Sequence, residues 1–200
     1  MPDIKWIGIV DGEISEYQKG NLDPKARKMK MPATMQKMMT AALPFAVIPF
    51  LLIFFSMFFK TFFVKQVVVN PVFIAIGFIL SFAGLFLHEL LHAIVYPKEA
   101  TVYIGFYPKA FAAVALASYP IKRGRFILMS LLPLLLGIVP LIIFWFSPAE
   151  FKTWNGFWFG FSIMGLISPY PDYYSVYQVL KQTPGGCRIQ FWGDDIYWIK

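Results

Sequence analysis

Cysteine is almost absent from this sequence of 200 residues, and histidine is nearly as rare. The single Cys187 excludes an internal disulfide framework and a cysteine-rich zinc site. Charged residues make up only 14% of the chain, against about 25% in an average soluble domain. Hydrophobic residues reach 58% and include 22 phenylalanines, more apolar side chain than a soluble core of this size buries. The composition therefore indicates an integral membrane protein.

The first 40 residues lack the apolar core and the small-residue cleavage site of a secretory signal. We therefore expect the first membrane helix to serve as an uncleaved insertion signal. No internal repeat or low-complexity tract is visible. The net charge of +7 is compatible with nucleic-acid binding, but the basic residues are distributed as in a membrane protein. We therefore expect a lipid bilayer, and no nucleic acid, as the partner.

Four apolar stretches are long enough to cross a hydrocarbon core of roughly 30 Å as helices, which takes about 20 residues. We place these spans at about 41–59, 72–96, 126–146 and 154–180. The fourth is interrupted by Pro169, Pro171 and Asp172. The predicted domains are a cytoplasmic N-terminal segment at 1–40, a four-span membrane domain at 41–180 and a cytoplasmic tail at 181–200.

Basic residues are concentrated on one side of this four-span arrangement. With the N-terminus in the cytoplasm, the segments 1–40, 97–125 and 181–200 hold 7, 5 and 3 of the 18 Lys and Arg residues. The outer loops hold the other three, which are Lys60, Lys65 and Lys152. Lys and Arg are enriched in cytoplasmic loops, and an odd number of spans would remove this bias. We therefore expect a multi-pass protein of the cell membrane with both termini in the cytoplasm.

Two segments predict β-structure beside the membrane helices. In residues 101–125, the turn-forming Pro108-Lys109-Ala110 separates two apolar runs, which predicts a β-hairpin at the cytoplasmic interface. An amphipathic loop is the alternative. The C-terminal CRIQFWGDDIYWIK predicts a second hairpin around Gly193-Asp194, and the N-terminal IKWIGIVDGEI is a candidate strand to pair with it. The predicted fold is an all-α integral membrane protein with about four transmembrane helices and two small β-hairpins.

His88, Glu89 and His92 interrupt the second apolar stretch, which reads FAGLFLHELLHAIVYP at 82–97. They include both histidines of the chain and its only acidic residue between Asp23 and Glu99. A carboxylate at the centre of a membrane helix costs about 2.5–3.5 kcal/mol on insertion scales. The i, i+4 spacing places both imidazoles on one helix face, as in the H-E-x-x-H zinc motif, where the glutamate is the general base. The alternative is a histidine pair that packs between helices and hydrogen-bonds to backbone or hydroxyl groups.

A catalytic zinc site needs three protein ligands, and the motif supplies two. The downstream candidates are Glu99, Glu150, Asp172, Cys187, Asp194 and Asp195. Only Asp172 lies within a predicted span, 16 residues after Gly156. His88 comes 16 residues after Val72, so both sites lie about 24 Å from the outer face at roughly 1.5 Å per residue. Asp172 is the expected third ligand; alternatively it is the N-cap of a short final helix, since Asp is a favoured N-cap.

The sequence HELLHA in an apolar span resembles a bacterial family of membrane proteins described as “putative zincin peptidases”. A hairpin-like segment, a proline-bearing third span after basic residues and an aspartate in the final span extend the resemblance to about residues 40–200. That family is similar in plan to the site-2 protease group of intramembrane metalloproteases. The resemblance implies that His88, His92 and Asp172 bind zinc and that Glu89 is the catalytic acid/base. It also implies a membrane-bound peptidase.

Three functions fit these residues. The first is hydrolysis of peptide bonds in membrane or membrane-proximal substrates by water activated on one Zn²⁺ per chain, with Glu89 as general base. The second is an ion or proton pathway, because intramembrane His, Glu and Asp also mark relays. The third is a structural metal site in an inactive membrane adaptor. Two imidazoles and one carboxylate also suit iron or manganese, whereas histidines at i, i+4 cannot occupy opposite axial positions of a haem.

Overall fold

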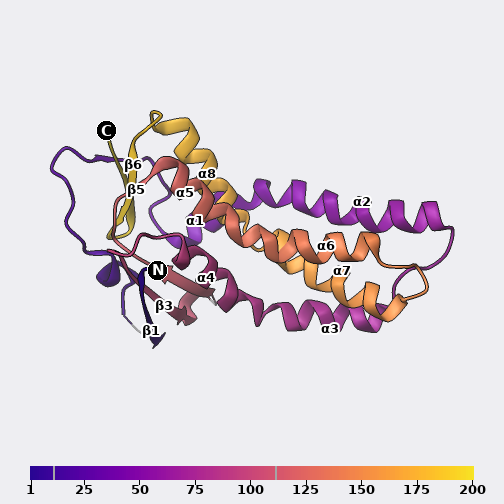
Figure 1. Cartoon of the computed structure of the whole chain (residues 1–200). Helices are drawn as coiled ribbons and strands as arrows, with labels where there is room; N and C mark the ends of the chain where they lie inside the picture. The colour runs from indigo at the N-terminus through magenta and orange to yellow at the C-terminus, as the bar shows by residue number, and fades with distance from the viewer. Residues whose placement is uncertain (11, 111) are drawn as a thin grey trace. The chain divides into compact units, whose positions relative to one another are not determined.

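Helices and two small β-sheets alternate along the chain (Figure 1), so the prediction of an all-α fold is wrong in this respect. The computed structural model describes residues 1–10, 12–110 and 112–200. It divides into a motif unit, residues 1–42, 86–132 and 171–200, and a helical unit, residues 43–85 and 133–170. The strands come from segments outside the apolar spans, where β-branched and aromatic residues favour pairing over helix.

The first sheet of the motif unit has the order β1-β3-β4. Its strands are β1 (Asp3–Ile9), β3 (Thr101–Tyr107) and β4 (Ala112–Leu116). The predicted hairpin is confirmed, because β3 and β4 pair antiparallel with Tyr103 opposite Leu116. The prediction that the N-terminal strand pairs with the C-terminal hairpin is wrong, because β1 pairs parallel with β3, with Asp3 opposite Thr101.

The second sheet has the order β2-β7-β6-β5. Its strands are β2 (Arg27–Lys28), β5 (Ile121–Lys122), β6 (Arg188–Trp192) and β7 (Asp195–Ile199). The predicted C-terminal hairpin is confirmed by the antiparallel β6–β7 pair. Gly193 has a φ of 61°, a left-handed conformation that glycine adopts readily and that tight hairpin turns require.

Helices of the motif unit pack on these sheets around a main hydrophobic core, and a smaller cluster at Val10, Val114 and Leu116 takes Met35 of the first helix. They are α1 (Met35–Ala42), α4 (Gly84–Ile94), α5 (Arg123–Leu131) and α8 (Tyr170–Gln182), with the 3₁₀ turns η1 (Ile14–Gln18) and η3 (Pro108–Ala110). The buried core side chains include Ala93 of α4, Val102 of β3, Phe126 of α5, Val179 of α8 and Ile189 of β6. Helices and strands distant in sequence therefore share one apolar interior, which fixes α4 and α8 within the same unit.

The helical unit contains α2 (Val47–Val64), α3 (Pro71–Ser81), α6 (Leu135–Phe146) and α7 (Lys152–Ile167), with the 3₁₀ turns η2 (Leu43–Ala46) and η4 (Leu132–Leu134) at its edges. Two glycines on α7, Gly156 and Gly160, bring its backbone close to that of α3. A Cβ atom on Gly160 would lie 2.1 Å from the carbonyl oxygen of Ile74. Small residues four apart allow such close helix packing within membranes.

We expect Gly160→Ala to lower the free energy of unfolding by about 1–3 kcal/mol, because the new methyl group would overlap the backbone of α3. Gly124→Ala is the matched control, since a Cβ atom on this helical glycine meets nothing within 4 Å. We expect the control to change stability by less than about 0.5 kcal/mol. Denaturant titration in detergent micelles measures both, and equal losses in the two variants would contradict the packing argument.

Two helical segments are long and apolar enough to cross a membrane, Met35–Val64 and Arg123–Phe146. A third candidate is α3 together with α4, which are bent by 45° at the break between them. The break contains i to i+3 hydrogen bonds, such as that from Ala83 N–H to the carbonyl of Leu80, and ends at Gly84. Within the described residues the predicted fourth span is not a candidate, because α7 has 16 residues and stops before Pro169.

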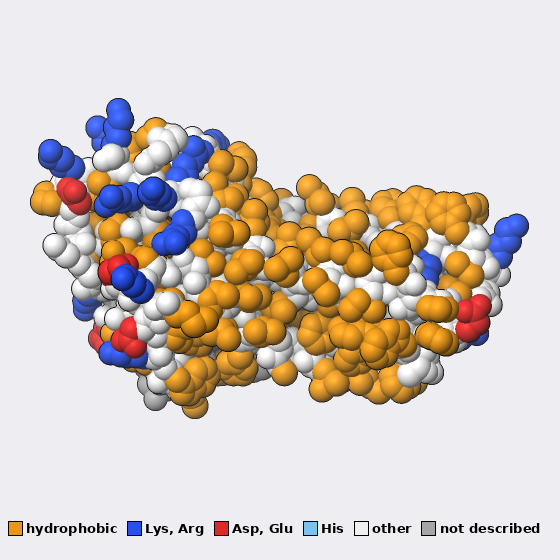
Figure 2. Space-filling model, in the orientation of Figure 1, with side chains coloured by type: hydrophobic (Ala, Val, Ile, Leu, Met, Phe, Trp, Pro, Cys, Tyr) orange, Lys and Arg blue, Asp and Glu red, His pale blue; other side chains and the backbone are white. Residues whose placement is uncertain are grey.

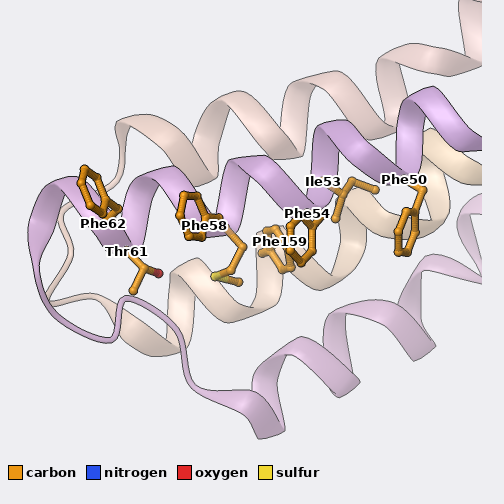
Figure 3. Close-up of a pocket in the computed structure, with 8 residues that line it drawn as sticks. Phe50, Ile53, Phe54, Phe58, Thr61, Phe62 and Phe159 are labelled. Carbon is orange, nitrogen blue, oxygen red and sulfur yellow. The ribbon is translucent and has the colours of Figure 1, made fainter.

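The surface of the helical unit is strongly apolar, and hydrophobic side chains cover much of its visible face in Figure 2. Figure 3 shows an apolar groove of about 610 Å³ between α2 and Phe159 of α7. Its lining on α2 comprises Phe50, Ile53, Phe54, Met57, Phe58, Thr61 and Phe62. Because this lining carries no titratable side chain, the groove offers no catalytic chemistry.

Candidate metal centre

Helix α4 presents His88 and His92 one turn apart on the same face. Their rings meet edge to face, with centroids 4.6 Å apart and an interplanar angle of 79°. Their Nε2 atoms lie 2.9 Å apart. The first turn of α8 adds Asp172, whose Oδ2 lies 3.4 Å from Nε2 of His88 and 3.6 Å from Nε2 of His92. Three side chains from two helices thus converge on one point.

These three ligand atoms fit a single tetrahedral cation. Zinc bonds to imidazole nitrogen and carboxylate oxygen measure about 2.0–2.2 Å, which separates neighbouring tetrahedral ligands by about 3.3–3.6 Å. The observed separations of 2.9, 3.4 and 3.6 Å are close to that range. Among the described residues, His88, His92 and Asp172 are the group of His, Cys, Asp and Glu side chains close enough together to hold one ion. The donor set and its spacing therefore fit zinc.

A second carboxylate lies against this group. Glu89 Oε1 is 3.9 Å from Nε2 of His88. The side chains of His88, Glu89 and His92 are only 11–13% exposed, and that of Asp172 is 24% exposed. Two carboxylates in so small and shielded a space repel each other, and a divalent cation between the ligands would offset both that repulsion and the cost of burial.

The His92 ring is held by the protein backbone. Its Nδ1 lies 2.8 Å from the carbonyl oxygen of Met129 in α5. A carbonyl only accepts hydrogen bonds, so Nδ1 carries the proton and donates. In the neutral ring Nε2 then keeps a lone pair, which faces the other two ligand atoms. Metal-binding histidines commonly donate their second nitrogen to a carbonyl or carboxylate in this way.

The Glu89 carboxylate also contacts the first sheet, where it accepts a hydrogen bond from the backbone of Ala115 in β4. Within the described residues β3 is the one strand paired with β4, so β4 forms an edge of that sheet. Neither Ala115 nor Met129 is predicted from the sequence to contact the site. Both act through backbone atoms, which every residue type carries, so no side-chain pattern marks them.

The structure brings together all four residues that the sequence singled out. Helix α8 begins at Tyr170, so Asp172 lies inside its first turn rather than at the N-cap that was the alternative. The aspartate instead faces the two histidines. The roles of His88, His92 and Asp172 as ligands, and of Glu89 as base, stay predictions that this geometry makes testable.

Comparison with known families gives one finding. A family model described as “Putative zincin peptidase” matches residues 81–188, just over half of the chain. The matched segment includes α4, the β3–β4 hairpin, α5 and α8 with Asp172. No curated protein and no solved structure matches the chain.

Proposed function

Since the chain belongs to the “Putative zincin peptidase” family, we propose that it is a membrane-embedded, zinc-dependent endopeptidase. It hydrolyses peptide bonds of membrane or membrane-proximal substrates. The observation that carries this proposal is the convergence of His88, His92 and Asp172, with ligand atoms 2.9–3.6 Å apart. Their position beside an acidic residue in the H-E-x-x-H arrangement is the second support.

His88, His92 and Asp172 would hold one Zn²⁺ through Nε2, Nε2 and Oδ2 respectively. Zinc with three protein ligands supplies Lewis acidity toward a peptide carbonyl and makes water a nucleophile near neutral pH. The hydrogen bond from His92 to the Met129 carbonyl keeps the ring in one tautomer and orientation. The Asp172 side chain is 24% exposed, and we propose that water reaches the ligand group past it.

Glu89 is the proposed general base and acid. It follows His88 directly on α4 and its Oε1 lies 3.9 Å from the Nε2 of that ligand. A carboxylate at this position takes the proton from the attacking water and then delivers it to the leaving amine. Its hydrogen bond to the backbone of Ala115 holds the side chain on the side of the ligands that faces β4.

The edge of β4 suggests how a substrate is presented. A helical substrate must unwind before hydrolysis, because a helix hides its carbonyl groups in internal hydrogen bonds. An extended peptide can instead add as a strand to an open sheet edge and gain main-chain hydrogen bonds. At β4 such a peptide would run beside Ala115, and therefore beside Glu89.

We further propose that the protein crosses the cell membrane four times, with both termini in the cytoplasm and the bilayer as its main partner. The candidate spans Met35–Val64 and Arg123–Phe146 and the bent α3–α4 pair support three crossings. Helix α7 has 16 residues and is not itself a candidate span, so its proposal as the fourth crossing rests on the even number of spans that the basic residues favour. The 15 basic residues in the proposed cytoplasmic segments, against three outside, support the orientation. This distribution gives no reason to expect a nucleic-acid partner.

Chelation tests the metal dependence of the proposed activity. We expect 1,10-phenanthroline to reduce cleavage of unfolded casein and of a membrane-anchored reporter at least 100-fold, and one equivalent of Zn²⁺ to restore it. The reason is that the proposed mechanism has no nucleophile other than activated water. Cleavage that persists in chelator would contradict the proposal. Ion flux into liposomes that is abolished by His92→Ala would favour an ion or proton pathway instead. Bound metal without any proteolysis would favour an inactive membrane adaptor.

A further inference from the structure

The Met129 carbonyl that accepts the His92 hydrogen bond lies in a helix, where a carbonyl normally has another partner. In an α-helix the carbonyl of residue i accepts from the N–H of residue i+4. For Met129 that residue is Pro133, and proline has no backbone N–H. The carbonyl is therefore left without its helical donor and is open to a side chain.

The neighbouring backbone N–H groups do not replace the missing hydrogen-bond donor to the Met129 carbonyl. The N–H of Leu132 donates to the carbonyl of Leu128, one residue before Met129. Helix α5 ends at Leu131, and the chain continues through the 3₁₀ turn η4 before α6 begins at Leu135. The acceptor 2.8 Å from His92 Nδ1 is thus a carbonyl exposed by a proline-induced break in the helix.

We propose that Pro133 is a positioning residue for the metal site, acting through the Met129 carbonyl on the orientation and tautomer of His92. This inference rests on the proposed function, because it assumes that His92 is a ligand. Pro133 itself is fully buried. Any other residue there would bring a buried N–H that needs an acceptor, and Met129 offers the one that helix geometry aligns with it.

The consequence for metal binding follows from this competition. An N–H at position 133 would donate to the Met129 carbonyl, as in a regular helix, and this competing hydrogen bond would weaken the one from His92. The ring would then be free to place its proton on Nε2, the nitrogen that must offer a lone pair to the metal. Loss of such an outer hydrogen bond typically costs about 10–100-fold in metal affinity.

The test compares Pro133→Ala with Pro140→Ala. Pro140 lies inside α6 and is also buried, so its replacement makes the same chemical change seven residues further along the chain. We expect Pro133→Ala to weaken Zn²⁺ binding by about 10–100-fold in competition with a chelating dye, and Pro140→Ala to leave it within about threefold. A Zn²⁺ affinity of Pro133→Ala within threefold of wild type, in a folded protein, would overturn the proposal.

A second measurement begins with the wild-type protein, so its first outcome does not depend on any variant folding. The chain has only two histidines, so the ¹⁵N spectrum of the metal-free protein labelled selectively at the histidine ring nitrogens contains only those four nitrogens. We expect His92 in the wild type to carry its proton on Nδ1, and Pro133→Ala to shift it toward Nε2. A wild-type His92 protonated on Nε2 alone would also overturn the proposal.

These readouts separate the two proposals. If His92→Ala still binds Zn²⁺ as tightly as the wild type, the proposed metal site is wrong, and the proposed function is wrong with it. Zn²⁺ binding that is lost in His92→Ala but unchanged in Pro133→Ala would leave the proposed function standing and remove only the role of Pro133.

Discussion

Replacement of Glu89 by glutamine is expected to reduce peptide-bond hydrolysis by about 10²–10⁴-fold, the usual contribution of a general base. The amide has nearly the same size as the carboxylate and its oxygen can still accept the hydrogen bond from Ala115. It cannot accept a proton from water near neutral pH, so the loss should fall on the chemical step. Zn²⁺ content should stay at about one per chain, because the three proposed ligands are untouched.

The measurement is the initial cleavage rate of the casein and membrane-anchored reporters, with zinc content determined on the same preparations. Glu99→Gln is the matched control, because Glu99 is exposed and lies beyond the end of α4. Its rate should equal that of the wild type. A Glu89→Gln variant that cleaves as fast as the wild type would refute the mechanism. A variant that also loses zinc would show that Glu89 acts on the metal rather than on the proton.

His92→Ala and Asp172→Ala should each lose the metal. The proposed site has three protein ligands, and two remaining ligands rarely retain zinc against detergent, buffer and dialysis. Their ligand atoms lie 3.6 Å apart in the wild type, so each deletion removes one corner of the same site. We expect about one zinc per chain in the wild type and less than about a tenth of that in either variant.

Mass spectrometry of metal content in detergent-purified protein checks this expectation. Glu150→Ala serves as control, since this exposed carboxylate was another downstream candidate and is not in the cluster. Zinc that is lost in His92→Ala but kept in Asp172→Ala would place the third ligand elsewhere. Absence of metal from wild-type protein never exposed to chelator would contradict the site as a whole.

The four candidate site residues, which the structure brings together, could be singled out from the sequence because each is a polar side chain in an apolar stretch. His88, Glu89 and His92 stand in an apolar helix, and their spacing follows from helix geometry alone. Asp172 is predicted by counting residues along two spans, although the structure breaks the second of these into α7, which ends at Ile167, and α8, which contains Asp172. Both hairpins were also predictable, since local turn residues such as Gly193 mark them.

Pairing between distant segments could not be predicted in the same way. β1 and β3 are separated by more than 90 residues, and no local pattern states which strand a hydrophobic segment will choose. The bend after Ser81 could not be predicted, because no proline lies at the break. It contains i to i+3 hydrogen bonds and ends at Gly84. The backbone contacts of Met129 and Ala115 could not be predicted from side-chain patterns either. Pro133 gives only an indirect sign of the first, because it lacks the N–H that would bond to the Met129 carbonyl.

The parallel pairing of β1 with β3 has a consequence for the order in which the protein is made. At about 5–20 residues per second, roughly 5–20 s separate the synthesis of Asp3 from that of Thr101, its partner. During that interval the ribosome produces the hydrophobic helices α2 and α3 and the bent helix α4. Asp172, the last proposed ligand, comes later still. The motif unit therefore completes its sheets and the proposed metal site only after the apolar helices α2 and α3 have been synthesised, so under the proposed function the order of synthesis itself delays the appearance of activity.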